Sequence, residues 1–97
     1  MGKRNVITLC GSTRFKAQFL GEQKRLTLAG NVVLSVGVFG HLGDKKMLDE
    51  IHRAKIDLSD QIHVINVGGY IGESTKSEIE YAEKTGKKIT YFEPIIL

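Results

Sequence analysis

Hydrophobic residues along this chain gather into four short runs, each separated from the next by polar segments and turn signals. The runs cover Val6–Cys10, Val32–Ser35, Ile62–Val67 and Ile89–Phe92, and most of their positions are apolar. Nearly continuous apolar runs are typical of strands that are covered on both faces, as in a parallel sheet. We therefore expect four strands of this kind.

Between these runs, apolar residues recur every three or four positions, which is the spacing of one helical face. The pattern predicts a first helix from about Arg14, capped by Ser12 or Thr13, and a second over about residues 45–58. The expected apolar face of the first helix is Phe15, Phe19, Leu26 and Ala29, and that of the second is Met47, Leu48, Ile51, Ala54 and Leu58.

The order of the elements predicts the fold class. A third helix follows the glycine-rich turn at 68–72, with Ile79 and Ala82 on its apolar face, so strands and helices alternate along residues 1–97. This order is typical of a single α/β domain, a three-layer sandwich of the Rossmann or flavodoxin kind. We expect a four-stranded parallel sheet of order about 2-1-3-4 flanked by helices. Ligands of such sheets bind beyond the carboxyl ends of the strands, so the residues that follow the strands are the candidates for a site.

The composition excludes several classes of protein. Hydrophobic residues make up 41% of the chain and charged residues 26%, and no apolar run approaches the roughly 18 to 20 residues of a membrane span. The net charge of +3 comes from scattered basic residues, which argues against a nucleic-acid partner. The single cysteine, Cys10, ends a buried strand and fits a reducing compartment. We expect a cytoplasmic protein with no membrane contact and with Cys10 in its core.

The segment Gly11-Ser12-Thr13-Arg14 stands where the first strand turns into the first helix. Its backbone N–H groups, two hydroxyls and guanidinium could converge on one anion at the positive end of the helix. The alternative is that Ser12 only caps the helix and Arg14 forms a surface ion pair. The segment matches neither the P-loop nor the Gly-x-Gly-x-x-Gly pattern, so we expect no nucleotide cofactor.

A second candidate segment, residues 68–78, brings glycines, hydroxyls and a carboxylate to the start of the third helix. Within it, Gly72, Ser74 and Lys76 are candidates for substrate binding. Glu78 would lie in the first turn, where it could act as a nucleophile or a general base. The alternative is a capping box Thr75-x-x-Glu78, in which Glu78 only accepts from the Thr75 backbone. The local pattern alone slightly favours the capping box.

The loop after the second strand and the helix that follows it supply the remaining candidates. Asp49, early in the second helix, is the best placed partner carboxylate. Phe39 and His41 could line a pocket for a flat base. His41, His52 and His63 fall in different elements without a second ligand at metal-binding spacing, so we expect no metal site and assign His63 to packing.

Three large apolar residues, Ile95, Ile96 and Leu97, close the sequence. They could pack on a neighbouring subunit or over the edge of the domain itself. We expect a homodimer or a higher homo-oligomer.

These motifs resemble those of the nucleoside 2-deoxyribosyltransferase superfamily, especially its short bacterial and phage members, and of the related 2'-deoxynucleoside 5'-monophosphate N-hydrolases. The resemblance covers about residues 6–92. It rests on Cys10-Gly11-Ser12-Thr13-Arg14, on the strand after Ser59-Asp60, and on Ser77-Glu78-Ile79-Glu80-Tyr81-Ala82.

The resemblance implies chemistry at the N-glycosidic bond of a (deoxy)nucleoside or its 5'-monophosphate. A glutamate at the place matched by Glu78 is the family's nucleophile, and the turn matched by Gly11, Ser12 and Arg14 holds the 5' end or phosphate. Asp49 would orient the sugar or protonate the departing base.

Two other hypotheses for the function stay open. One is a catalytically silent nucleotide-binding module. The other is a nucleotide phosphoribohydrolase of the Lonely-Guy kind, whose glycine-rich loop and glutamate are distantly similar to Gly68-Gly69-x-x-Gly72-x-x-Thr75-x-x-Glu78.

Overall fold

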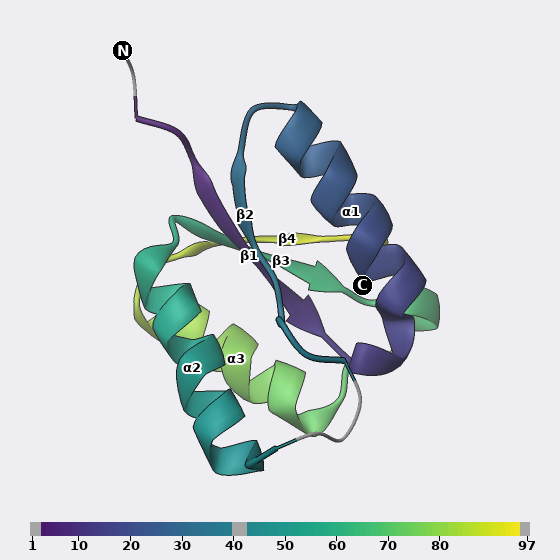
Figure 1. Cartoon of the computed structure of the whole chain (residues 1–97), viewed down its shortest axis with the longest axis vertical. Coiled ribbons are helices and arrows are strands. Elements are labelled where there is room, and N and C mark those ends of the chain that lie inside the picture. The colour runs from purple at the N-terminus through teal and green to yellow at the C-terminus, as the bar shows by residue number, and fades with distance from the viewer. Residues whose placement is uncertain (1–2, 40–42, 96–97) are drawn as a thin grey trace.

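The fold is built on four strands that correspond to the four apolar runs. The computed structural model describes residues 3–39 and 43–95. Its strands are β1 (Val6–Gly11), β2 (Val32–Leu34), β3 (Gln61–Ile65) and β4 (Lys88–Tyr91), and they form one sheet in the order β2-β1-β3-β4 (Figure 1). Each neighbouring pair of strands is parallel. The predicted fold class and strand order are confirmed.

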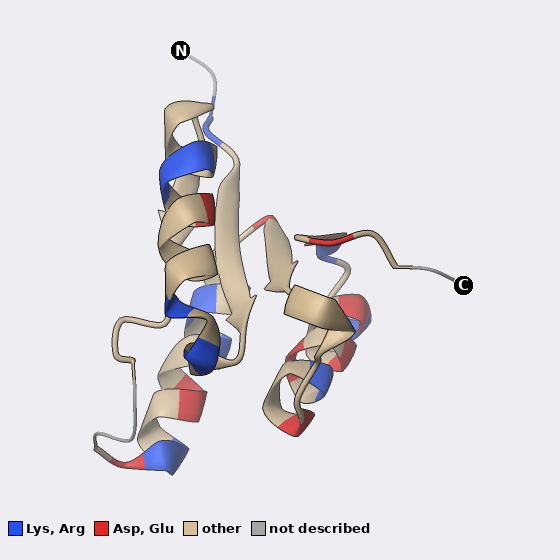
Figure 2. Ribbon diagram, turned by 90° about the vertical axis from the view of Figure 1, so that its right-hand side faces the viewer, with Lys and Arg blue, Asp and Glu red and all other residues tan. Residues whose placement is uncertain are grey.

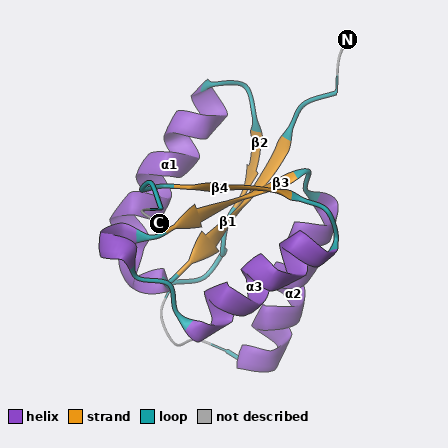
Figure 3. Ribbon diagram, turned by 180° about the vertical axis from the view of Figure 1, so that it is seen from behind, coloured by secondary structure: helices purple, strands orange, loops and turns teal. Residues whose placement is uncertain are grey.

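Three α-helices connect the strands and cover the two faces of the sheet. They are α1 (Lys16–Leu28), α2 (Lys45–Leu58) and α3 (Glu73–Lys84); single 3-10 turns, η1 (Thr13–Phe15) and η2 (Val67–Gly69), follow β1 and β3. Helix α1 lies on one face, and α2 and α3 lie side by side on the other (Figure 3). Basic and acidic residues are distributed over all three helices (Figure 2). None of the helices described is both long enough and apolar enough to cross a membrane.

Two apolar clusters hold these layers together, because successive residues of a strand point to opposite faces. The cluster under α1 contains Ile7, Leu9, Phe19, Leu26 and Ile65. The cluster under α2 and α3 contains Cys10, Ile56, Ile62, Val64 and Ala82. Cys10 is fully buried, as the sequence predicted.

Strand β2 is less buried than its apolar run predicted. It pairs only with β1 and therefore forms an edge of the sheet. As a result the Val32 side chain is 45% exposed. An edge strand has a neighbour on one side only, and an apolar run by itself does not distinguish an edge from the centre of a sheet.

Helix α2 has the predicted bounds, but the prediction of its buried face is wrong. The residues facing the sheet are His52 and Ile56, with Leu48 partly buried one turn earlier. Most of the predicted face is exposed instead: Met47, Ile51, Ala54 and Leu58. The buried stripe has the i, i+4 spacing of one helical face and consists of Leu48, His52 and Ile56. The histidine at its centre makes this stripe hard to recognise in the sequence.

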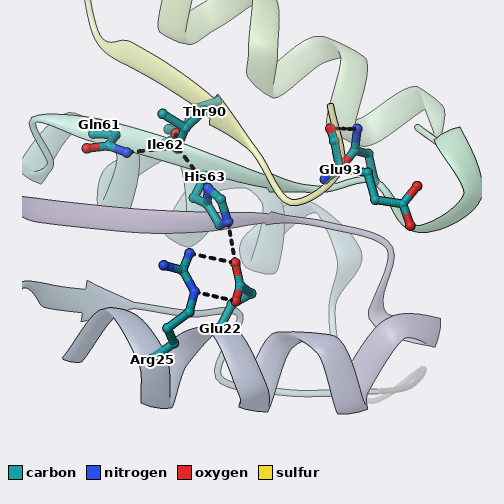
Figure 4. A network of polar contacts seen from close by, with 8 residues as sticks. Glu22, Arg25, Gln61, Ile62, His63, Thr90 and Glu93 are labelled. Atoms are coloured by element: carbon teal, nitrogen blue, oxygen red, sulfur yellow. Dashed lines mark hydrogen bonds and ion pairs between the residues drawn. The ribbon is translucent and has the colours of Figure 1, made fainter. Parts of the chain in front are cut away.

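A network of polar side chains links α1 to β3 and β4 (Figure 4). Arg25 donates two hydrogen bonds to Glu22, at 2.8 and 2.9 Å. Glu22 Oε1 lies 2.8 Å from His63 Nε2, and Thr90 Oγ1 lies 2.8 Å from His63 Nδ1. Since an ionised carboxylate only accepts, Nε2 donates to Glu22. His63 is thus a hydrogen-bonded packing residue, as predicted.

Candidate functional site

A pocket opens beyond the carboxyl end of β1, between the loop after β2 and the helices α2 and α3. Its volume is about 480 Å³, and we call it the site pocket. A neighbouring groove of about 590 Å³ runs between α2 and α3. Four residues line both hollows: Lys45, Asp49, Ser74 and Glu78. The position at the strand ends is where parallel α/β sheets bind ligands.

Three acidic side chains line the site pocket, and Glu78 is the one shielded from solvent. The side chain of Glu78 is 16% exposed, against 55% for Asp49 and 93% for Glu73. Burial, and next to it the charge of Asp49, raises the pKa of Glu78 to about 7. A perturbed carboxyl group in a pocket is a marker of a functional site.

The helix start excludes the capping box as the role of Glu78. Helix α3 begins at Glu73 with Gly72 as its N-cap, so Thr75 is the third residue of the helix and not its cap. Thr75 is buried and lines the site pocket. Glu78 consequently lies in the second turn, not in the first as predicted, and its side chain is free to face the pocket.

Two residues touch Glu78 from other elements. His52 on α2 places Nε2 at 3.7 Å from Glu78 Oε2. The thiol of Cys10, at the end of β1, lies against the Glu78 carboxyl group, with Sγ within 4.8 Å of a carboxyl oxygen. Burial lowers the pKa of His52 to about 4 and raises the pKa of Cys10 well above its usual value. Near neutral pH, both neighbours are therefore uncharged.

The motifs of the sequence give no reason to place His52 at the site, yet this residue lines the site pocket. The available signal was its spacing: it lies four residues after Leu48 and four before Ile56, on the stripe that faces the sheet. A polar residue in the middle of a buried stripe has to be explained by a partner. Its polar neighbour here is Glu78, at a distance longer than that of a hydrogen bond.

Asp49 lies at the rim of the pocket, where it is held by an ion pair. Lys45 Nζ is 2.7 Å from Asp49 Oδ2, one helical turn away, and this contact raises the pKa of Lys45. Asp49 is close enough to Glu78 for its charge to raise the Glu78 pKa. Asp49 is thus an exposed, charged group at the pocket, in contrast to the buried Glu78.

The turn after β1 forms another wall of the pocket. Gly11, Ser12 and Thr13 all line it. A side chain at Gly11 would be excluded, because a Cβ there would approach the Ile65 carbonyl oxygen to 2.9 Å and the φ of +156° disfavours other residues. The approach of β1 to β3 at this point therefore requires glycine.

Ser12 caps the turn that follows, and Arg14 contacts an aromatic ring. Ser12 Oγ accepts from the backbone N–H of Arg14 at 3.4 Å and from its Nε at 3.1 Å. The guanidinium carbon lies 4.2 Å from the centre of the Tyr70 ring, and Nη2 donates to the Tyr70 hydroxyl at 3.3 Å. Tyr70 itself lines the site pocket. Arg14 is held beside the pocket through Tyr70, and among the residues described it forms no ion pair.

The remaining candidates from the sequence divide into two groups. Gly72 and Ser74 line the site pocket together with Glu78. Lys76 does not line it and pairs with Glu73 at 3.4 Å, and Phe39 packs edge-to-face on Phe19 in the core under α1. His41 lies outside the described residues.

Comparison with known proteins identifies the fold. No protein-family model matches the chain, and no curated protein matches it in sequence. A solved structure described as a 2-desoxiribosyltransferase from Leishmania mexicana is similar to it, with a TM-score of 0.74 and 17% sequence identity. The match covers 91% of this chain and 63% of the solved chain. The chain therefore has the fold of a deoxyribosyltransferase and spans less than two thirds of that protein's length.

Proposed function

We propose that this protein breaks or transfers the N-glycosidic bond of a (deoxy)nucleoside or its 5'-monophosphate, with Glu78 as the nucleophile. The observation that carries the proposal is the position of Glu78. It is the shielded carboxyl group of a pocket at the strand ends, on a fold shared with a protein named as a deoxyribosyltransferase.

The first step would form a bond between a Glu78 carboxylate oxygen and the anomeric carbon of the sugar. The bond from that carbon to the base nitrogen breaks, and its electron pair leaves with the base. The leaving base takes up a proton from solvent in the pocket, and Asp49, paired with Lys45 at the rim, would orient the sugar. A carboxylate also stabilises the positive charge that develops on the sugar.

The second step would release the sugar from Glu78. Water or the nitrogen of a second base attacks the anomeric carbon, and the ester oxygen leaves with its electron pair as the Glu78 carboxylate. Two displacements at one carbon retain its configuration. The choice between water and a base decides whether the protein is a hydrolase or a transferase.

The turn after β1 is suited to the 5' end of the substrate. The hydroxyls of Ser12 and Thr13 and the nearby guanidinium of Arg14 provide hydrogen-bond donors at one wall of the site pocket. Hydrogen bonds from such groups to a phosphate are among the stronger polar contacts in proteins. Arg14 would have to leave the Tyr70 hydroxyl, or share it, in order to reach a phosphate.

Release of free base from a substrate panel tests the proposal. We would incubate the protein with ribo- and deoxynucleosides and their 5'-monophosphates, with and without an acceptor base, and separate the products by chromatography. Glu78→Gln should abolish release, whereas the matched control Glu80→Gln, an exposed position on the same helix, should preserve it. No release by a folded wild-type protein from any member of the panel would contradict the proposal and favour the silent binding module.

A further inference from the structure

Three side chains with metal-binding atoms converge behind the site pocket. They are Cys10 from β1, His52 from α2 and Glu78 from α3, and their ligand atoms all lie within 4.8 Å of one another. His52 Nε2 and Glu78 Oε2 are 3.7 Å apart. Ligand atoms around a tetrahedral zinc ion are separated by roughly 3.3–3.8 Å, given the usual zinc–ligand distances. The separations in this structure therefore exceed that spacing by about 1.5 Å at most.

The three donor types are those that zinc selects. A thiolate, an imidazole nitrogen and a carboxylate oxygen are the ligands of zinc sites, and the sulfur disfavours magnesium and calcium. The chain has no other cysteine, so any metal–thiolate bond must involve Cys10. The sequence predicted no metal site because the three residues are 42 and 26 positions apart, from 10 to 52 and from 52 to 78, and no short motif joins them.

The arrangement leaves one side of such an ion open. His52 and Glu78 line the site pocket, while Cys10 is fully buried behind them. An ion held by the three atoms would thus face the pocket with its fourth coordination position. The electrostatic surroundings are mixed: Asp49 is close, Lys45 is paired with Asp49, and Arg53 lies near Glu78.

We propose that Cys10, His52 and Glu78 form a three-ligand site for Zn²⁺, and that the ion, when bound, withholds Glu78 from any other reaction. Binding forms bonds from the metal to Sγ, to an imidazole nitrogen and to a carboxylate oxygen. The thiol proton, and the Glu78 proton where that carboxyl group still holds one, pass to solvent, because a thiolate and a carboxylate are the ligands. No oxidation or reduction is involved.

The two parts of this proposal depend on different premises. The metal site stands on the geometry of the three side chains. The inhibitory effect rests on the proposed function, in which Glu78 is the nucleophile. A test of metal binding that uses no substrate therefore separates the failure of one from the failure of the other.

Cobalt is the probe for this test, because Co²⁺ takes the place of Zn²⁺ and absorbs light. We would titrate the full chain with cobalt chloride alone and record its absorption spectrum. The wild type should show a thiolate-to-cobalt charge-transfer band in the near ultraviolet together with intense visible bands of a four-coordinate ion. Addition of zinc chloride should abolish both.

Three variants assign the ligands. Cys10→Ser should lose the charge-transfer band, and Glu78→Gln and His52→Gln should each weaken cobalt binding by about tenfold or more, since even outer-shell changes cost that much. Asp49→Asn, a pocket residue outside the three, should keep the band. If Cys10→Ser does not fold, the His52 variant still tests the site.

The competing outcomes are distinct. Absence of the charge-transfer band from the wild type at millimolar cobalt, or visible bands without it, overturns the metal site. Undiminished binding by His52→Gln overturns the assignment of the ligands. Cobalt binding by a protein that releases no base from any substrate would uphold the metal site and contradict only the proposed function.

Discussion

The Nε2 atom of His52 lies 3.7 Å from the Oε2 atom of Glu78, and this contact joins α2 to α3 beside the site pocket. The pKa of His52 is about 4 and the pKa of Glu78 is about 7. Between these values both groups are uncharged, so their contact is not an ion pair. The separate titrations of the two groups therefore determine how the site affects the stability of the protein.

We expect Glu78→Gln to stabilise the protein at pH 8. The folded state holds the Glu78 proton up to about pH 7, whereas the unfolded state loses it near 4.5, so folding opposes ionisation. Stability contributed by the protonated group is lost as pH rises from about 4.5 through 7. A shift of this size corresponds to about 3 kcal/mol at pH 8, which the variant should regain.

Urea unfolding at pH 8 and at pH 4.5 measures this effect, with a metal chelator present. The gain should be large at pH 8 and small at pH 4.5, where the wild-type carboxyl group is protonated. Glu80→Gln, the exposed control, should change stability little at either pH. Equal effects of the two variants at pH 8 would show that burial does not perturb Glu78.

His52 should have the opposite effect on stability. Its pKa is lower in the folded state, so the stability it contributes is present above about pH 6.5 and is lost as pH falls through 4. From pH 4.5 to 6.5, His52 therefore makes the free energy of unfolding rise with pH, while Glu78 makes it fall. The two changes offset each other. We expect a nearly flat contribution from the pair in the wild type, and His52→Gln should expose a decline of up to about 1.4 kcal/mol per pH unit. A pH series of urea midpoints would reveal it, and parallel profiles would contradict it.

If Glu78 is the nucleophile, base release should depend on its ionisation. The carboxylate reacts and the carboxylic acid does not, so kcat/KM should increase with pH and level off above about 7. Initial rates measured from pH 5 to 9 with a chelator present would check this. Rates that do not rise between pH 5 and pH 7 would mean that Glu78 is not the reacting carboxylate.

The buried network under α1 should be important for stability. Glu22→Ala would leave His63 and Arg25 without their shared acceptor, and we expect a loss of about 3 kcal/mol. Arg25→Ala should cost under about 1 kcal/mol, because the arginine side chain is 59% exposed and remains hydrated. Thermal or urea unfolding at pH 7 would compare them. Similar small losses would show that the Glu22–His63 contact contributes little.

The exposed apolar face of α2 leads us to expect self-association. Met47, Ile51 and Leu58 are 48%, 45% and 71% exposed, and Ile95 is 47% exposed. Exposed apolar patches often mark interaction surfaces. Sedimentation velocity at tens of micromolar should show an oligomer, and Ile51→Lys should shift it towards the monomer. A wild-type monomer at that concentration would contradict this expectation.

The sequence predicted the strands well because a strand of a parallel sheet is covered on both faces and therefore consists of a nearly continuous apolar run. Val6–Cys10 and Ile89–Phe92 required no knowledge of their neighbours to be identified. The face of α2 could not be predicted in this way, since Met47 and Ile51 are more apolar than His52 and yet point outwards. The structure places His52 beside Glu78, 26 positions further along the chain, and no local pattern joins the two residues.

Glu78 illustrates the limit of local patterns at the site. Thr75-x-x-Glu78 satisfies the capping-box pattern, but the helix starts at Glu73 and makes the pattern coincidental. The start is set by Gly72 and the preceding turn, whose geometry a propensity argument does not resolve. The candidate residues of the β1 turn were easier to place, because they follow directly from the end of a strand.

The single thiol of this chain lies behind Glu78 and has no exposed surface. A thiol reagent added to the folded protein can therefore react only when β1, α2 and α3 separate locally or the whole chain unfolds. The rate of Cys10 modification therefore reports how often the site opens. A ligand that holds the site pocket closed would lower this modification rate. Ligand binding could then be measured without any turnover.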